Sequence, residues 1–200
     1  HWVDVIMLGI LSEIENVGLY TASIRTSEFI LLIIWVFYPI FTPLSAKLIK
    51  ERNFESLKRY FHKIVILSLF LSLPLLYTFV LKGDLILKIL FGAEFEVMKK
   101  VLVIMGFSNL LMAIQSPFVS ILLMSGEQKT WAKFNFISLI INIILNFTLI
   151  KLFNTLGAAI ATSISFVFLT FSSFYLFGKK KFFNLDFKVI ILFFLLQIFV

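Results

Sequence analysis

The chain is dominated by apolar runs that are long enough to cross a lipid bilayer. Four runs approach the roughly 20 residues that a spanning helix needs: Ile64–Leu81, Val101–Met124, Phe136–Ile150 with its flanks, and Gly157–Phe177. A helix is the only open-ended element that satisfies its own backbone hydrogen bonds in lipid, so these runs are helices rather than strands. We therefore predict an all-α, polytopic membrane protein.

The sequence begins at His1 and both of its ends fall inside apolar runs, so we expect a piece of a larger membrane protein. The absence of cysteine leaves no disulfide framework and no thiol nucleophile. Its two histidines, His1 and His62, are too far apart in the sequence to suggest a metal centre. We expect neither a metal nor a cofactor.

The placement of the lysines and arginines predicts an orientation. Twelve of them fall on one side of an alternating topology, in loops 47–63, 125–133 and 178–188, and six fall on the other side. The twelve are Lys47, Lys50, Arg52, Lys58, Arg59, Lys63, Lys129, Lys133, Lys179, Lys180, Lys181 and Lys188, and the six are Arg25, Lys82, Lys88, Lys99, Lys100 and Lys151. The positive-inside rule places the first set in the cytoplasm. The net charge of +7 is therefore a topology signal and not a sign of nucleic-acid binding.

The resulting map has six spanning segments and the start of a seventh. They lie at about 1–11 (running outward), 18–46, 62–82, 97–125, 130–152 and 156–178, and a further helix begins near Asp186. The segment Gly83–Phe95 is too short to span and is expected along the outer interface. The segment Asn53–His62 has an apolar face of Phe54, Leu57, Tyr60 and Phe61, which predicts an amphipathic helix on the cytoplasmic membrane surface.

Ionisable residues inside spans are costly in lipid and are functional candidates by default. Asp4 lies seven residues before Leu11, roughly 10 Å along a helix, which places it in the outer half of the bilayer. It could bind a ligand or a coupling ion, or be a structural carboxylate that is hydrogen-bonded to a neighbouring helix.

Arg25 and Glu28 are three residues apart, so they share a helix face and can pair. In a straight helix Arg25 would lie roughly 33 Å from the cytoplasmic boundary, near the outer rim, unless the helix tilts or bends at Pro39 and Pro43. The pair is either an interfacial ion pair or a cationic group at a cavity wall, where a guanidinium suits a phosphate.

Two helices carry polar residues at helical spacing. One stripe contains Asn135, Ser138, Asn142 and Asn146; the other contains Asn109, Ala113, Ser116, Pro117 and Ser120, with Gln115 beside it. Small residues at Gly157, Ala161 and Ser165 allow close approach of helices. Such stripes are typical of packing seams, and for Asn142 and Asn146 a seam and a sugar-facing wall both remain open.

Several strings in succession resemble a known family. They are Asp4-Val-Ile-Met-Leu-Gly, Glu15-Asn-Val-Gly-Leu-Tyr-Thr-Ala-Ser, Pro43-Leu-Ser-Ala-Lys-Leu, Ile89-Leu-Phe-Gly-Ala-Glu-Phe, Ser125-Gly-Glu-Gln-Lys and Leu156-Gly-Ala-Ala-Ile-Ala-Thr-Ser-Ile-Ser. In this order they resemble the C-terminal half of polysaccharide-export flippases, the O-antigen (Wzx-type) transporters of the multidrug/oligosaccharidyl-lipid/polysaccharide superfamily.

The resemblance implies a transporter of two six-helix lobes around a cavity. Residues 1–178 would form the second lobe with its first helix truncated, and 179–200 a basic cytoplasmic loop and the start of an extra helix; the N-terminal lobe would be missing. Family members flip polyprenyl-pyrophosphate-linked oligosaccharides across the cytoplasmic membrane, in some cases coupled to H⁺ or Na⁺. The resemblance gives Arg25 the role of pairing with the pyrophosphate. Glu28, Asp4, Gln115, Asn109, Asn142 and Asn146 complete the expected substrate-binding set.

Three other interpretations of such a chain stay open. A cation-coupled multidrug antiporter of the same superfamily would use Asp4 as its coupling site. A polymerase or ligase of glycan assembly usually carries a large outer loop with catalytic polar residues. Here the longest outer segment, about 83–97, offers only Asp84, Glu94 and Glu96. A lone half-transporter could also be a nonfunctional fragment.

Overall fold

The computed structural model describes residues 2–180, apart from the side chain of Ile33. Its elements are α1 (Trp2–Leu11), α2 (Ile14–Ser27), the 3₁₀ turn η1 (Glu28–Leu31), α3 (Leu32–Lys50), α4 (Phe54–Phe91), the 3₁₀ turn η2 (Ala93–Met98), α5 (Lys99–Met124) and α6 (Gln128–Lys180). No strand occurs among these residues, so the all-α prediction is confirmed.

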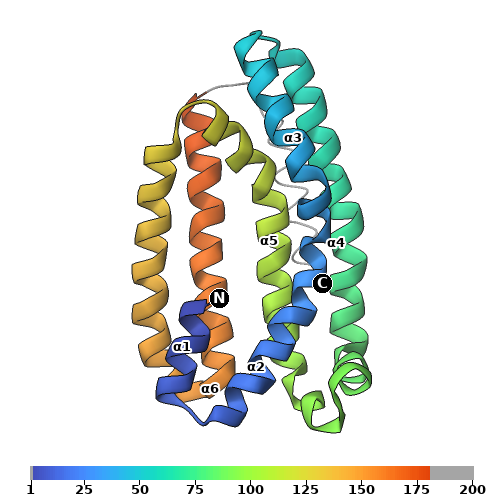
Figure 1. Cartoon of the computed structure of the whole chain (residues 1–200), viewed down its shortest axis with the longest axis vertical. Helices are drawn as coiled ribbons and strands as arrows, with labels where there is room; N and C mark the ends of the chain where they lie inside the picture. The colour runs from blue at the N-terminus through green and yellow to red at the C-terminus, as the bar shows by residue number, and fades with distance from the viewer. Residues whose placement is uncertain (1, 181–200) are drawn as a thin grey trace.

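The helices form an elongated bundle with its chain turns at two ends (Figure 1). Three stretches are long and apolar enough to span a membrane: α4, the segment Ala93–Met124, and α6. The stretch formed by α2, η1 and α3 adds a fourth span, bent by 47°. The predicted helix near Asp186 lies outside the described residues.

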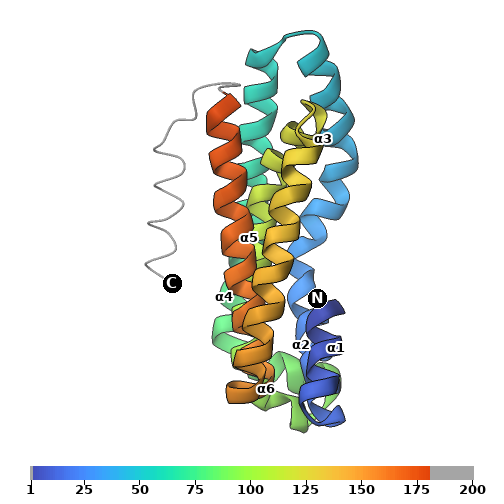
Figure 2. The same cartoon turned by 90° about the vertical axis from the view of Figure 1, so that its left-hand side faces the viewer.

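α6 consists of two antiparallel spans because its backbone breaks at Asn154, where φ is 49° and ψ is −126°. The two halves lie side by side in both views (Figures 1 and 2). A glycine at position 157 permits this tight turn, since a Cβ there would lie 2.0 Å from the Leu149 carbonyl oxygen. The break falls between the spans predicted at 130–152 and 156–178.

The span predicted at 18–46 bends directly after η1, not at its prolines. Pro39 and Pro43 both lie inside α3, and the direction changes between Leu31 and Ile34. The bend is held from the side by α4, whose Ser72 hydroxyl donates to the Ile30 carbonyl at 3.4 Å. The bend therefore lies on the C-terminal side of Arg25, with η1 between them.

α5 is the central helix of the bundle. The most apolar stretch of Ala93–Met124 is 61% buried, against 28% in α4 and 22% in α6. α5 packs against α2, α3, α4 and α6. Gly106 admits this packing on the α4 side, because a Cβ there would lie 3.1 Å from Leu76 and 3.2 Å from Phe79.

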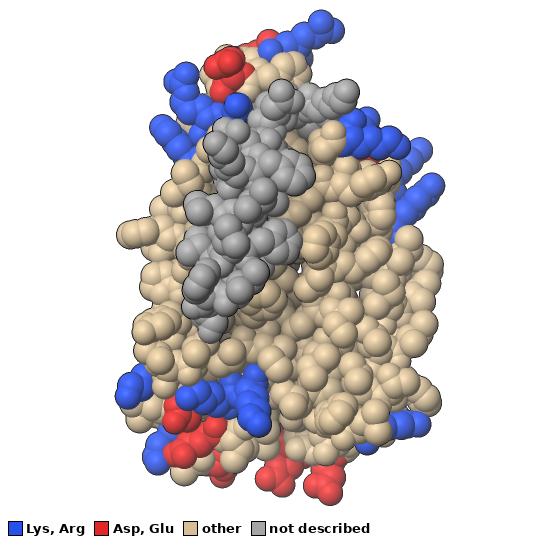
Figure 3. Space-filling model, turned by 180° about the vertical axis from the view of Figure 1, so that it is seen from behind, with Lys and Arg blue, Asp and Glu red and all other residues tan. Residues whose placement is uncertain are grey.

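Charged side chains gather at the two ends and leave an apolar belt between them (Figure 3). The end with the 50–54 and 124–128 turns, the basic end, carries ten of the described lysines and arginines; the opposite end, the far end, carries the five lysines of the outer set. Arg25 lies in the last turn of α2, eleven residues from the start of that helix. The belt and the spans identify a multi-pass membrane protein.

The predicted surface helix at Asn53–His62 is wrong as a separate element. α4 starts at Phe54 and continues into the span without interruption until Lys82, where φ is −127°. Leu57 and Phe61 are 0% and 1% exposed, because they pack with Phe118 and Phe177 in the protein core rather than against lipid. The end of this span at Lys82 agrees with the prediction of 62–82.

Candidate transport site

Asp4 belongs to a buried polar network that joins α1 to both halves of α6. Its Oδ1 accepts a hydrogen bond from Asn146 Nδ2 at 2.8 Å. Asn146 Nδ2 also donates to Asn142 Oδ1 at 3.0 Å, and Asn142 Nδ2 donates to Thr162 Oγ1 at 3.2 Å. All four side chains are at most 9% exposed. We call these four residues the Asp4 network.

The sequence spacing explains how the Asp4 network forms. Asn142 and Asn146 are four residues apart and so share one face of the first half of α6. Thr162 meets them because it and Asn142 are equally distant from Leu152, close to the break at Asn154. The break thus folds Thr162 back onto Asn142. Asn142 and Asn146 share one face, as predicted, and Thr162 is a further member of the network that the sequence did not indicate.

An apolar shell encloses the Asp4 network. Tyr20 is fully buried beside Asp4 and Thr162. Leu8, Ile150 and Ala158 are each 0% exposed in the same core cluster as Tyr20. Oxygen ligands within such a shell suit a small hard cation or a proton. In the described residues the carbonyl oxygen of Asn146 is buried and accepts no hydrogen bond, which leaves one such ligand available.

Arg25 and Glu28 form the predicted pair, at the last turn of α2 and the start of η1. Arg25 Nη1 donates to Glu28 Oε2 at 3.0 Å. The Arg25 side chain is 60% exposed and that of Glu28 is 15% exposed. They line an open groove of about 110 Å³ together with Phe29, Leu32 and Trp35. We call this the Arg25 groove.

The guanidinium of Arg25 retains most of its capacity to bind a ligand. In the described part of the chain it makes one hydrogen bond, to Glu28, so four of its five N–H donors are free for an anion. The aromatic rings of Phe29 and Trp35 are 52% and 61% exposed beside it. The groove therefore combines a free cationic fork with an apolar surface.

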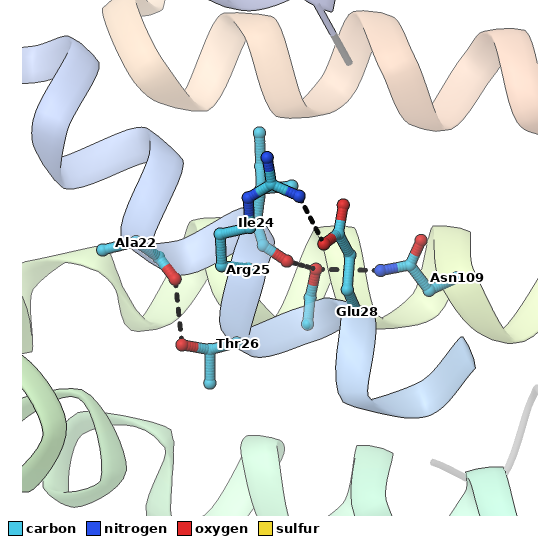
Figure 4. A network of polar contacts seen from close by, with 7 residues as sticks. Ala22, Ile24, Arg25, Thr26, Glu28 and Asn109 are labelled. Carbon is cyan, nitrogen blue, oxygen red and sulfur yellow. Dashed lines mark hydrogen bonds and ion pairs between the residues drawn. The ribbon is translucent and has the colours of Figure 1, made fainter. Parts of the chain in front are cut away.

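Asn109 anchors the helix that carries Arg25. Its Nδ2 donates to Ser27 Oγ at 2.8 Å, and Ser27 Oγ donates to the Ile24 carbonyl at 2.7 Å. Figure 4 shows Asn109 reaching from α5 toward the turn that holds Arg25 and Glu28. Asn109 is fully buried and so does not itself line the groove.

The predicted residues therefore fall into two groups. Asp4, Asn142 and Asn146 lie in the Asp4 network, whereas Arg25, Glu28 and Asn109 lie at or behind the Arg25 groove. Gln115 is 6% exposed, and no hydrogen bond of the described residues joins it to either group. The aromatic residues of the groove were missed because Phe29 and Trp35 are indistinguishable in sequence from lipid-facing ones.

Comparison with known proteins identifies the family. The sequence model of the MatE family matches residues 1–148 of the 200. The chain belongs to the MatE family. The spans and the apolar belt agree with a multi-pass membrane protein of this family.

Two curated relatives extend this result. The chain is 26% identical to the "Probable low-salt glycan biosynthesis flippase Agl15" of Haloferax volcanii, over 82% of the chain and 35% of the relative. It is 28% identical to the "Capsular polysaccharide biosynthesis protein CapF" of Staphylococcus aureus, over 84% of the chain and 44% of the relative. The chain therefore spans less than half the length of these relatives. No solved structure matches it significantly.

Both relatives are named for polysaccharide or glycan biosynthesis, and one of them is named a flippase. The resemblance to polysaccharide flippases is thus confirmed.

Proposed function

We propose that this chain forms one lobe of a transporter that flips polyprenyl-pyrophosphate-linked oligosaccharide across the cytoplasmic membrane. Relatives named for glycan flipping and capsular polysaccharide biosynthesis support the substrate class. The ten described basic residues at the basic end support a cytoplasmic location of loops 47–63 and 125–133. The third loop, 178–188, reaches beyond the described residues.

The observation that carries the proposal is the exposed guanidinium of Arg25 in its groove. A pyrophosphate accepts paired hydrogen bonds from a guanidinium fork. Glu28 orients Arg25 through one nitrogen and leaves the others for the ligand. The exposed rings of Phe29 and Trp35 offer an apolar surface on which the first isoprene units or a sugar face can rest.

A second lobe would face the Arg25 groove across a cavity. The length of the curated relatives leaves room for such a lobe. Rocking of the two lobes would then expose the bound pyrophosphate first to one leaflet and then to the other, as in rigid-body alternating access. No bond is made or broken in this cycle.

Surface glycan in cells that carry the full-length transporter tests the role of Arg25. Arg25→Ala should abolish most surface glycan at unchanged expression, and Arg25→Lys should restore only part, because an ammonium lacks the fork. Arg59→Ala is the matched control, since Arg59 is an exposed arginine at the basic end. Normal surface glycan in Arg25→Ala would remove Arg25 from the mechanism.

We further propose that the Asp4 network binds the coupling ion, H⁺ or Na⁺. Its carboxylate and amide oxygens are hard ligands, and the surrounding burial makes the site selective for a small cation. The same network would serve the second candidate function, a cation-coupled multidrug antiporter. Cation-dependent dye efflux by the full-length protein, lost in Asp4→Asn, would favour that candidate. Glycan flipping that depends on Na⁺ or on pH, also lost in Asp4→Asn, would favour the first.

A further inference from the structure

A polar pocket opens at the far end of the molecule, away from the Arg25 groove. It has a volume of about 520 Å³ and is lined by Ile10, Leu11, Ser12, Glu13, Asn16 and Asn154. The turn between α1 and α2 forms one wall, and the break in α6 forms the other. We call it the far-end pocket.

The polar groups of the far-end pocket remain open to a ligand. Glu13 is exposed and precedes α2 without a side-chain capping bond. Asn16 Nδ2 donates to Ser12 Oγ at 2.8 Å, which leaves the amide oxygen of Asn16 available. A carboxylate and an amide oxygen at the mouth of a pocket attract cations and reject anions.

A single apolar layer separates the far-end pocket from the Asp4 network. On α1, Leu8 lies four residues from Ser12 on one side and four from Asp4 on the other. On the first half of α6, Ile150 lies four residues from both Asn154 and Asn146. Each step of four residues is one helical turn, about 6 Å along the axis.

The second half of α6 repeats the same spacing. Ala158 lies four residues after Asn154 and four before Thr162. Leu8, Ile150 and Ala158 are each 0% exposed and belong to one core cluster. Three helices thus place an apolar residue at the same depth between two polar levels. We call these three residues the Leu8 layer.

The path from the network to the basic end is longer. Asn146 is eight residues from the pocket residue Asn154, about 12 Å along the helix. Asn142 is fourteen residues from the start of α6 at Gln128, about 21 Å. The far-end pocket is therefore the nearer aqueous approach to the Asp4 network.

We propose that the far-end pocket is the entrance through which a small monovalent cation reaches the Asp4 network, and that the Leu8 layer is the gate. This rests on the proposed coupling role of Asp4. In the described conformation the gate is closed, because the layer is fully buried. Separation of α1 from the α6 hairpin by the width of a water molecule would join the two polar levels.

Cysteine accessibility tests the gate without any need for transport. The 200 residues contain no cysteine, so an introduced one is unique within them. A permanently cationic, membrane-impermeant methanethiosulfonate is applied from the far side to the full-length protein in sealed vesicles. Asn16→Cys should react fast, and Thr162→Cys should react slowly.

Truncation of the gate should expose Thr162→Cys. With Leu8→Ala its reaction should accelerate by at least about tenfold, because the truncation leaves a cavity in the layer. Ile150→Ala opens the same layer from another helix and should do the same. Leu57→Ala is the matched control, since Leu57 is 0% exposed in a separate cluster at the basic end. The rate for Asn16→Cys in each background reports whether the far end remains folded.

The outcomes separate the gate from the coupling role. Unchanged labelling of Thr162→Cys in both gate variants, with normal labelling of Asn16→Cys, overturns the gate whatever transport shows. Faster labelling from the basic side also overturns it. If the gate variants do accelerate labelling, slowing by Na⁺ identifies Na⁺ as the ion. Acid slows the labelling of any cysteine, because the thiolate is the form that reacts, so H⁺ is identified by acid that slows Thr162→Cys more than Asn16→Cys. If labelling accelerates but transport depends on neither Na⁺ nor pH, the entrance through the far-end pocket is supported and the coupling role of Asp4 is contradicted.

Discussion

Asn146 donates a hydrogen bond to Asp4 at 2.8 Å and so joins two residues that are 142 positions apart in the sequence. The bond connects α1, the shortest α-helix of residues 2–180, to the α6 hairpin inside the apolar belt. A carboxylate in this position is costly without partners. The bond therefore accounts for how α1 tolerates Asp4 and why α1 packs against α6.

Removal of the carboxylate should destabilise the protein. Asp4→Ala leaves the buried amide of Asn146 with one partner fewer, and such a loss costs about 1–3 kcal/mol. Unfolding of the full-length protein in detergent measures the loss. Asp84→Ala is the control: Asp84 is exposed and pairs with Lys99 at 3.3 Å, so the change should stay below about 0.5 kcal/mol. Equal effects of the two substitutions would contradict the buried network.

Gly157 should not tolerate a methyl group. A Cβ at this position would overlap the Leu149 carbonyl, a backbone atom that cannot rotate away. Gly157→Ala should cost about 1–3 kcal/mol or more, as overpacking does. Gly18→Ala meets no atom within 4 Å and serves as the control. Thermal unfolding compares the two, and an unaffected Gly157→Ala protein would show that the α6 turn is built differently.

Asn109 and Ser27 should be energetically coupled. A double-mutant cycle of Asn109→Ala and Ser27→Ala should give a coupling of about 0.6 kcal/mol, and at most about 1.7, as for other hydrogen bonds between membrane helices. The single variants should also weaken transport, since Ser27 lies two residues after Arg25. Strict additivity of the two variants in unfolding experiments would rule out the bond at 2.8 Å.

Glu127 should make the stability of the basic end depend on pH. The Lys180 ammonium, which pairs with it, and the Thr130 hydroxyl, at 2.7 Å, hold the pKa of the Glu127 carboxyl below its ordinary value of 4.5. A lowered pKa in the folded state means that the contribution is complete above pH 4.5 and is lost as the pH falls through the folded pKa.

Comparison with Glu127→Gln measures this contribution. The stability of the native protein relative to Glu127→Gln should stay constant from neutral pH down to about 4.5 and then decline. When Lys180→Gln is added to the native protein and to Glu127→Gln, most of the pH dependence of their stability difference should disappear. A difference that grows on acidification would have the wrong sign for a lowered pKa.

Much of the fold follows from the sequence because lipid limits a chain to long apolar helices. Hydropathy predicted the spans at 62–82, 97–125, 130–152 and 156–178. The break at Asn154 falls in the gap between the last two. The bend between Leu31 and Ile34 could not be predicted from the sequence. Pro39 and Pro43 are the strongest helix breakers in this region, yet α3 accommodates both and the bend lies where α4 packs against Ile30.

The candidate site was predictable only in part. Ionisable and amide residues stand out in apolar runs, and this identified Asp4, Arg25 and Asn146. Which of them contact one another depends on long-range packing. Asp4 contacts Asn146 because α1 packs against α6, and Thr162 contacts Asn142 because the α6 hairpin sets the register of its two halves. The prediction that Leu57 and Phe61 lie on the membrane surface was wrong for the same reason. The apolar face of a surface helix and that of a buried helix have the same sequence pattern, and both residues are buried.

Flipping by the reconstituted full-length protein tests the central claim most directly. Polyprenyl-pyrophosphate-linked oligosaccharide is incorporated into sealed vesicles, and its movement between leaflets is followed by its loss of protection from an external glycan-cleaving enzyme. The native protein and Arg59→Ala should accelerate this movement equally over protein-free vesicles, and Arg25→Ala should not accelerate it. Native protein that moves the lipid no faster than empty vesicles, or Arg25→Ala that moves it as fast as native, would contradict the account.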